Sequence, residues 1–406
     1  MTNVAIMGYG TVGSGVYEAL CMNEALVTAR VGGARVMRVL DLRDFPGDPA
    51  ENILTHDFND ILNDDSIAVV AELMGGVGAA YNFTKQLLAR GKSVVTSNKE
   101  LVAKHGAELI ALAAANGVSY LFEASVGGGI PVIRPMTRSL TGDAVTNVTG
   151  ILNGTTNYIL SRMTKEGAAY ADVLKDAQAL GYAEADPAAD VEGHDAQRKL
   201  AILLSLALAK QVDSDDIETK GITRVTKEDI AYAKKLRGVV KLLATGHVEN
   251  GKVSARVAPV IVPKGHPLSM VNDVFNAAFL EGNCVGELMF YGHGAGKLPT
   301  ASAVVGDILE AASAMEEKRT VKILWNAEKQ AVSGFADVKE KRLFRVKGAV
   351  LAPRKGYGEA ITDVADGEYA MTAPAMTESE WQAAKAALLQ EPGIEDILGV
   401  YVILSK

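Results

Sequence analysis

Six residues near the N-terminus have the types and spacing of a dinucleotide-binding turn. They follow a short apolar run at residues 4–7 and read Gly8-Tyr9-Gly10-Thr11-Val12-Gly13. In the pattern Gly-x-Gly-x-x-Gly, the glycines permit a tight turn, close approach of the backbone to a pyrophosphate, and close packing of helix on strand. The free N–H groups that begin the next helix would face the phosphates. We predict that this segment binds NAD or NADP; a plain turn is the alternative.

Two side chains at the end of the next predicted strand, residues 35–42, could select between the two nucleotides. Asp41 could hydrogen-bond the ribose 2′-hydroxyl of NAD, and Arg43 could bind the 2′-phosphate of NADP. In an extended chain these two side chains point the same way. Asp41 lies further beyond Gly13 than the usual distance of roughly 20 residues, and we attribute the extra length to the loop at 31–34. The choice between NAD and NADP stays open, and a solvated Asp–Arg pair is the alternative.

An acid-rich segment, residues 181–192, precedes a helix predicted at 194–209. Asp195 and Lys199 are four residues apart near the start of this helix and therefore share one face. Lys199 is the last charged residue before an apolar stretch, where partial burial would lower its pKa toward values useful for proton transfer. An exposed ion pair without a catalytic role fits the spacing equally well.

Polar residues also follow two predicted strands, at the edge of the sheet where ligands usually bind. The first group begins at Glu72, and the second contains Ser97 and Lys99. Lys99 places a cation where a substrate or cofactor would lie; a surface lysine at a strand end is the alternative. Cys21 and Cys284 lack the setting of a nucleophile, which argues against a covalent cysteine mechanism.

Short apolar runs alternate with helical segments along the first part of the chain. This alternation is typical of a parallel sheet with helices on both faces, so residues 1–135 are predicted to form a Rossmann-like, doubly wound dinucleotide-binding domain of the α/β class. Residues 136–318 mix strands and helices, which predicts a second, α+β domain. Residues 319–406 are predicted to form a small C-terminal α+β unit with a strand, an amphipathic helix and a closing strand.

Composition and charge exclude several classes of protein. The 406-residue chain carries 49 acidic and 41 basic residues and a net charge of −8, whereas proteins that bind nucleic acid or anionic membranes usually carry the opposite balance. Its two cysteines cannot form a disulfide framework. The N-terminus lacks a signal-peptide pattern, and no apolar stretch is long enough to cross a bilayer. We therefore expect a cytoplasmic protein with no nucleic-acid or membrane partner.

Seven segments of the chain occur in the order of the motifs of one enzyme family. They are Gly8-x-Gly-x-x-Gly13, Glu72-Leu-Met-Gly-Gly76, Val94-Val-Thr-Ser-Asn-Lys99, Glu123-Ala-Ser-Val-Gly-Gly-Gly-Ile-Pro131, Gly150-Ile-Leu-Asn-Gly-Thr-Thr-Asn-Tyr158, Leu180-Gly-Tyr-Ala-Glu-Ala-Asp-Pro187 and Gly294-Ala-Gly-Lys-Leu-Pro-Thr-Ala-Ser302. On these motifs, residues 1–315 resemble homoserine dehydrogenase. The resemblance implies NAD(P)-dependent interconversion of the small molecules L-aspartate 4-semialdehyde and L-homoserine by hydride transfer, on the route to threonine and methionine.

The resemblance also implies roles for single residues. Lys199 matches the family's proton-transferring lysine, Asp195 matches its supporting acid, and Lys99 matches a lysine that faces both substrate and nicotinamide. Glu184 matches the carboxylate that holds the substrate. The family residues next to that carboxylate in the substrate site correspond to Tyr182, Asp190 and Thr155. The fingerprint, the two strand ends and the resemblance together predict cofactor contacts for Gly8, Gly10, Thr11, Val12, Gly13, Asp41, Arg43, Ser97, Lys99 and Gly296.

Three further features are implied by the resemblance. In the family, a sodium ion is held by backbone carbonyls of the loop that matches Glu123, Val126, Gly128 and Ile130. The family's second domain carries the dimer contact, so we expect a homodimer or higher homo-oligomer, with residues 136–318 as the substrate-binding and dimerisation domain. Many bacterial relatives end in a ligand-sensing ACT domain, and the C-terminal unit looks like a reduced or divergent version without the usual first helix.

Two other functions compete with this hypothesis. Phosphorylating aspartate-semialdehyde dehydrogenase acts on the same substrate, but it needs a cysteine nucleophile to form a thioester. A regulatory protein that senses dinucleotides would need neither Lys199 nor Glu184 in an acid-rich pocket. Homoserine-dependent reduction of NAD(P)⁺ separates the three hypotheses.

Overall fold

The first part of the chain forms a parallel sheet with the strand order β3-β2-β1-β4-β5-β6. The computed structural model describes residues 1–405. The strands are β1 (Thr2–Met7), β2 (Ala34–Leu40), β3 (Leu54–Thr55), β4 (Val69–Glu72), β5 (Ser93–Thr96) and β6 (Tyr120–Leu121). Every residue of β4 and β5 is buried, and because alternate side chains point to opposite faces, both faces must be covered. The predicted doubly wound α/β fold is confirmed.

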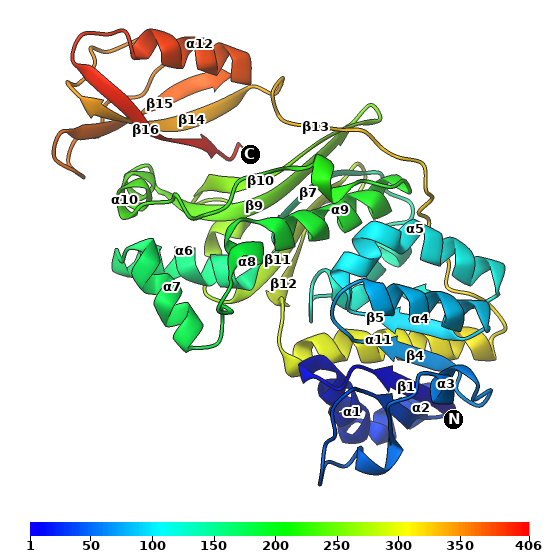
Figure 1. Ribbon diagram of the computed structural model, residues 1–406. Coiled ribbons are helices and arrows are strands. Elements are labelled where there is room, and N and C mark those ends of the chain that lie inside the picture. Colours follow the sequence, from blue (N-terminus) through cyan, green and yellow to red (C-terminus); the bar gives the residue numbers. More distant parts are fainter. Residues whose placement is uncertain (406) are drawn as a thin grey trace.

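The helices that cover this sheet come from two distant parts of the chain (Figure 1). They are α1 (Thr11–Met22), α2 (Glu24–Val31), α3 (Asn59–Leu62), α4 (Gly78–Ala89), α5 (Lys99–Ala115) and α11 (Lys297–Glu316). Helix α11 packs closely on α1 because Gly15 leaves room for it; a Cβ there would lie 2.9 Å from Lys297. Part of the segment 136–318 therefore lies against the nucleotide-binding sheet, and the domain boundaries at 135 and 318 stay a proposal.

The second sheet is mixed and has ten strands, with the main order β12-β11-β7-β9-β10-β16-β14-β15. Its strands before β14 are β7 (Val145–Ile151), β8 (Glu218–Thr219), β9 (Gly238–Glu249), β10 (Lys252–Pro263), β11 (Phe275–Gly282), β12 (Gly286–His293) and β13 (Val332–Ser333). The turn between β9 and β10, Asn250-Gly251, has φ of 51° and 75°, which a tight two-residue hairpin requires.

Five helices accompany this second sheet. They are α6 (Gly154–Glu166), α7 (Tyr170–Ala179), α8 (Ala188–Val191), α9 (His194–Leu208) and α10 (Lys227–Lys235). Helix α9 packs on β7, β9 and β10 and also on α5 of the first domain. This contact brings the start of α9 to the carboxyl ends of the parallel strands.

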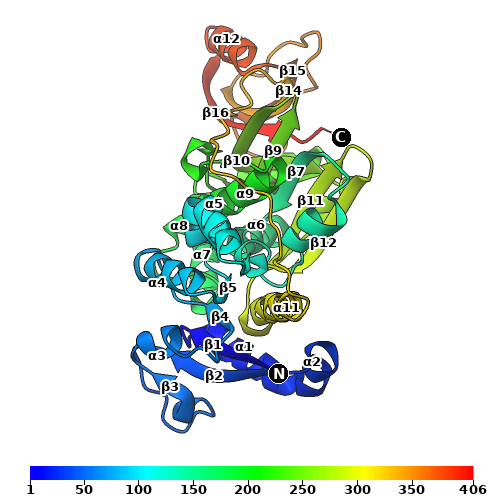
Figure 2. The same ribbon diagram turned by 90° about the vertical axis from the view of Figure 1, so that its right-hand side faces the viewer.

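The C-terminal unit continues the second sheet and lies at the end of the molecule opposite the nucleotide-binding sheet (Figure 2). Besides β13, it contains β14 (Glu340–Gly348), β15 (Glu368–Met376), α12 (Glu378–Leu388) and β16 (Ile394–Ile403). β16 pairs with β10, and Arg345 of β14 forms an ion pair with Asp229 of α10 at 2.7 Å. Between β14 and β15 the described chain contains no helix. The ACT-like assignment stays a prediction, and Lys406 lies outside the described residues.

Three of the longer strands, β9, β11 and β15, were not predicted from the sequence. Most of β9 is buried on both faces, so its residues do not alternate between apolar and polar types. A strand without this alternation is hard to distinguish from a buried helix. Within residues 1–405, no helix combines the length and the apolar composition needed to span a membrane.

Candidate functional site

A cavity of about 340 Å³ lies where the nucleotide-binding sheet meets the second domain. Its walls come from the turn after β1, the carboxyl ends of β4 and β5, the loop after β6, and the starts of α9 and α11. Residues from these segments that line it include Val12, Ser97, Lys99, Gly128, Lys199 and Gly294. Open α/β sheets bind their ligands in this kind of crevice. Residues predicted to bind the cofactor and the lysine predicted to transfer a proton therefore share one cavity.

The turn after β1 has the shape that its glycines predict. Gly8 has a φ of +90°, and a Cβ there would lie 2.7 Å from the carbonyl oxygen of Leu73. A Cβ on Gly13 would lie 2.0 Å from the carbonyl oxygen of Gly8. Helix α1 begins at Thr11, and no side chain caps its N-terminus. Its first N–H groups are therefore available to a phosphate.

Asp41 follows β2 directly and lies beside this turn. Its Oδ2 accepts the backbone N–H of Tyr9 at 2.7 Å, and its Oδ1 accepts Nε of Arg43 at 3.0 Å. The Arg43 guanidinium lowers the pKa of Asp41 to about 2. As expected, the side chains of Asp41 and Arg43 point the same way, and they form a direct ion pair. The extra residues between Gly13 and Asp41 form mostly the helix α2. The expectation that the loop at 31–34 accounts for them was therefore wrong.

Lys99, Asp195 and Lys199 form one charge cluster at the cavity. Lys199 Nζ lies 2.7 Å from Asp195 Oδ2 and donates to the carbonyl of Leu152 at 2.8 Å. The ammonium of Lys99 pairs with the other carboxylate oxygen of Asp195. Asp195 is 2% exposed and Lys199 is 8% exposed. Helix α9 supplies Asp195 and Lys199 one turn apart, and α5 supplies Lys99 as its first residue.

Burial and the neighbouring charges shift the pKa values of this cluster. Burial lowers the pKa of the Lys199 ammonium, and the carboxylate of Asp195 opposes that shift. Burial alone would raise the pKa of Asp195, but the two ammonium groups hold it below its ordinary value. Asp195 is therefore ionised, and the pKa of Lys199 moves toward the range in which a lysine exchanges protons near neutral pH.

Asn153, which the sequence analysis did not select, connects this cluster to the acid-rich segment. Its Nδ2 donates to Asp190 Oδ1 at 2.7 Å and to Asp195 Oδ2 at 2.9 Å. Its side-chain oxygen caps α6 by accepting the N–H of Thr156 at 2.9 Å. Burial raises the pKa of Asp190. The available signal was an asparagine between a strand and a helix, a typical capping position.

The other predicted substrate residues lie on or beside the acid-rich segment, outside the lining of the cavity. Thr155 Oγ1 donates to the carbonyl of Tyr182 at 2.7 Å. The ring of Tyr182 contacts that of Tyr158, with centroids 4.9 Å apart. Glu184 is exposed, and its carboxylate forms no hydrogen bond or ion pair with any residue in 1–405. The structure therefore joins Thr155 to Tyr182 but leaves Glu184 apart from the charge cluster.

Glu123 stabilises the loop that forms one wall of the cavity. Its buried carboxylate accepts three consecutive backbone N–H groups, those of residues 132–134, at 2.6–2.9 Å. In the described part of the chain, no hydrogen bond reaches the carbonyl oxygens of Val126, Gly128 or Ile130. These oxygens are the donor type that a hard cation takes.

Two remaining residues lie at the edges of the cavity. Gly296 precedes α11 with a φ of 120°, next to the lining residues Gly294 and Ala295. Glu72 ends β4, where its carboxylate accepts the hydroxyl of Thr96 at 2.6 Å, and burial raises its pKa to about 7. Glu72 therefore holds the ends of β4 and β5 together beneath the cavity, a role that the sequence analysis did not assign.

The fold and the cavity together define a class of enzyme. The dinucleotide-binding turn and Lys199, which forms a buried ion pair with Asp195, lie on the walls of one cavity, an arrangement that suits hydride transfer coupled to proton transfer. Cys21 and Cys284 are both exposed, and neither lines the cavity, so a thioester mechanism lacks its nucleophile. The protein is an NAD(P)-dependent oxidoreductase.

Comparison with known proteins specifies the family. The family model described as homoserine dehydrogenase matches residues 131–309, and its NAD binding domain matches residues 8–123. The homoserine dehydrogenase of Bacillus subtilis is 43% identical over 310 residues, which cover 75% of this chain and 72% of that protein. The homoserine dehydrogenase of Mycobacterium bovis is 48% identical over 317 residues, with coverages of 76% and 72%. The chain belongs to the homoserine dehydrogenase family and acts on the CH–OH group of homoserine.

Solved structures extend the similarity to the whole chain. A homoserine dehydrogenase from Thiobacillus denitrificans superposes with a TM-score of 0.89 at 32% identity, covering 100% of this chain and 98% of that one. A hyperthermophilic archaeal homoserine dehydrogenase mutant in complex with NADPH superposes with a TM-score of 0.64 at 28% identity, covering 77% of this chain and 98% of that one. The NAD(P)-dependent oxidation of homoserine to aspartate semialdehyde is thus the activity of this family and of this chain.

Proposed function

We propose that Lys199 transfers the proton in this reaction, that Asp195 holds its ammonium in place, and that Lys99 faces the substrate and the nicotinamide. The bound nicotinamide nucleotide supplies or accepts the hydride. In the direction of aldehyde reduction, the substrate oxygen becomes an alkoxide that needs a proton, and the ammonium of Lys199 is the donor. The observation that carries this proposal is the buried 2.7 Å contact between Lys199 and Asp195 in the cavity of the dinucleotide-binding turn.

We further propose that the acid-rich segment binds the α-ammonium of homoserine. Glu184 offers an exposed carboxylate without a protein partner in residues 1–405. Tyr182 is a near neighbour of Glu184 in the sequence, and its carbonyl accepts the hydroxyl of Thr155 at 2.7 Å. Asp190 connects this subsite to Asp195 through Asn153. A carboxylate and a carbonyl are the partners that an ammonium group needs.

Glu184→Gln tests the substrate subsite. The amide keeps the size of the side chain but loses the charge, so KM for homoserine should rise roughly 10- to 100-fold, as expected for a lost hydrogen bond between charged groups. The fall in kcat should be smaller, and KM for the nucleotide should stay the same. Steady-state kinetics with each substrate varied in turn measures these effects.

Asp186→Asn is the matched control, because Asp186 is an exposed acid of the same segment whose contact is the N–H of Ala188, which asparagine can also accept. This control should leave both KM values unchanged. If Glu184→Gln also leaves KM and kcat unchanged, the acid-rich segment does not bind the substrate.

We propose that Asp41 and Arg43 allow the use of both NAD and NADP. The side chain of Arg43 is 62% exposed and lies near Gly10, so it can move from Asp41 to a 2′-phosphate. Asp41 keeps the N–H of Tyr9 as a partner and remains able to accept a ribose hydroxyl. The first turn of α1, including Thr11 and Val12, and Ser97 complete the proposed cofactor contacts.

Arg43→Ala should therefore raise KM for NADP on the order of tenfold and leave KM for NAD nearly unchanged. Arg43→Lys keeps a positive charge and should lie between the wild type and the alanine variant. The six KM values, for the wild type and the two variants with each nucleotide, follow from initial rates. Equal losses for NAD and NADP would show that Arg43 does not recognise the 2′ position.

The proposal also covers a cation site, the oligomeric state, the cellular location and the domain boundaries. The backbone carbonyls of Glu123, Val126, Gly128 and Ile130 would hold a sodium ion and so stiffen the cavity wall. A homodimer or higher homo-oligomer would form through the second domain, where the outer strand β12 exposes Met289 and Tyr291. We also propose a cytoplasmic location, the domain boundaries 1–135, 136–318 and 319–406, and an ACT-like origin of the C-terminal unit.

A further inference from the structure

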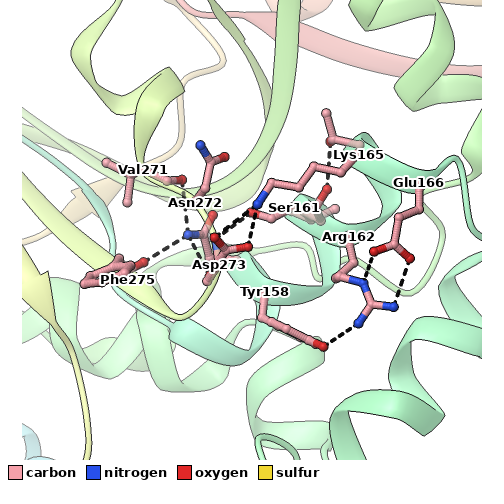
Figure 3. Close-up of polar contacts among 12 residues, drawn as sticks. Tyr158, Ser161, Arg162, Lys165, Glu166, Val271, Asn272, Asp273 and Phe275 are labelled. Carbon is pink, nitrogen blue, oxygen red and sulfur yellow. Dashed lines mark hydrogen bonds and ion pairs between the residues drawn. The ribbon is translucent and has the colours of Figure 1, made fainter.

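Helix α6 contacts two different loops through two rows of side chains. Both rows follow the helical spacing of three or four residues. The first row is Asn157, Ser161 and Lys165, and the second row is Thr155, Tyr158 and Arg162. Figure 3 shows Ser161 and Lys165 directed toward Asp273, and Arg162 between Tyr158 and Glu166.

The first row fastens α6 to the loop that leads into β11. Nδ2 of Asn157 lies 2.9–3.2 Å from three carbonyl oxygens of residues 271–275. Ser161 Oγ accepts the N–H of Asp273 at 3.0 Å, and Lys165 pairs with the carboxylate of Asp273 at 2.8 Å. These contacts fix the helix to the second sheet, so α6 is a firm support for whatever its other row holds.

The second row holds the acid-rich segment. Thr155 donates to the carbonyl of Tyr182 at 2.7 Å, and the buried ring of Tyr158 lies 4.9 Å from the exposed ring of Tyr182. Arg162 donates to the hydroxyl of Tyr158 at 2.6 Å, which fixes that ring. Arg162 also contacts Asp176 at 3.2 Å, on the helix α7 that leads into the segment.

We propose that Tyr158 and Arg162 are positioning residues for the amino-acid substrate. Neither lines the cavity; they act by setting the place of the acid-rich segment, and thereby of Glu184 and the Tyr182 carbonyl, relative to Lys199. This inference rests on the proposed role of the segment in binding the α-ammonium. It predicts that removing contacts of the second row raises KM for homoserine and leaves KM for the nucleotide unchanged.

The test compares substitutions on the two rows of one helix. Tyr158→Ala should raise KM for homoserine about 2- to 10-fold, the factor that an aromatic pair of this kind contributes. KM for the nucleotide should not change, and kcat should change less than KM. Arg162→Met, which keeps Tyr158 but removes the contacts of the guanidinium with Tyr158 and Asp176, should also raise KM, by a smaller factor. It serves as the second variant if Tyr158→Ala folds poorly.

Lys165→Met is the matched control, because it removes a charge from the same helix on the row that faces away from the segment. It should leave KM for homoserine unchanged. The inference fails if Glu184→Gln raises KM for homoserine while Tyr158→Ala and Arg162→Met do not. It also fails if Arg162→Met and Lys165→Met have the same effect. If Glu184→Gln and both second-row variants leave KM unchanged, the role of the segment itself is refuted.

Discussion

Lys199→Ala is expected to lower kcat by about 10²–10⁴-fold, the usual contribution of a positioned acid–base group. The alkoxide formed at the substrate oxygen during aldehyde reduction would lose its proton donor, and homoserine oxidation would lose its proton acceptor. Nucleotide affinity should barely change, because the proposed phosphate contacts are at the turn after β1 and not at Lys199. Steady-state rates in both directions and nucleotide binding followed by fluorescence measure the two effects.

One further variant distinguishes loss of the transferable proton from loss of the positive charge, and a second variant serves as a control. Lys199→Arg keeps a cation beside Asp195, but a guanidinium does not release a proton near neutral pH, so its kcat should stay low. Lys165→Ala removes an exposed lysine that does not line the cavity and should be fully active. Turnover near the wild-type level in Lys199→Ala would remove Lys199 from the mechanism.

Asp195→Asn is expected to have the second-largest effect, on both stability and pH dependence. Asp195 is 2% exposed and balances the charge of Lys199, and loss of one partner of a buried pair costs about 3–5 kcal/mol. The carboxylate normally raises the pKa of Lys199 against the effect of burial. Without it the pKa falls further, so Lys199 loses its proton at lower pH. The alkaline limb of aldehyde reduction should therefore move to lower pH.

Asp229→Asn is the matched control for this prediction. Asp229 is also 2% exposed and pairs with Arg345 at 2.7 Å, but it lies beside the C-terminal unit. Urea denaturation should show a loss of stability for both variants, whereas only Asp195→Asn should shift the pH–rate profile. An unchanged alkaline limb in Asp195→Asn would show that this carboxylate does not control the proton of Lys199.

Local sequence rules predict those parts of the site that depend on one turn or one helix. The spacing of Gly8 and Gly13 after an apolar run predicts the dinucleotide-binding turn, because the backbone there leaves no room for a Cβ. The four-residue spacing of Asp195 and Lys199 predicts their contact, which the structure has at 2.7 Å. Whether that pair is buried was left open, since spacing along one helix does not reveal what packs on it.

Other parts of the site depend on contacts between distant segments. Asn153 reaches both Asp190 and Asp195 only because β7 and α9 pack side by side. Helix α11 returns to the nucleotide-binding sheet because Gly15 of α1 accommodates it. No pattern in the neighbouring sequence encodes either contact. The roles of the site residues, including those carried over from the family, stay predictions until they are tested.

The activity is tested most directly by homoserine-dependent reduction of NAD⁺ and NADP⁺ by the purified wild-type chain, followed by nucleotide absorbance. Reduced nucleotide should appear only when homoserine is present, without phosphate, and aspartate semialdehyde should drive the reverse reaction. If homoserine produces no reduced nucleotide under conditions in which the protein binds the nucleotide, the chain is not a homoserine dehydrogenase.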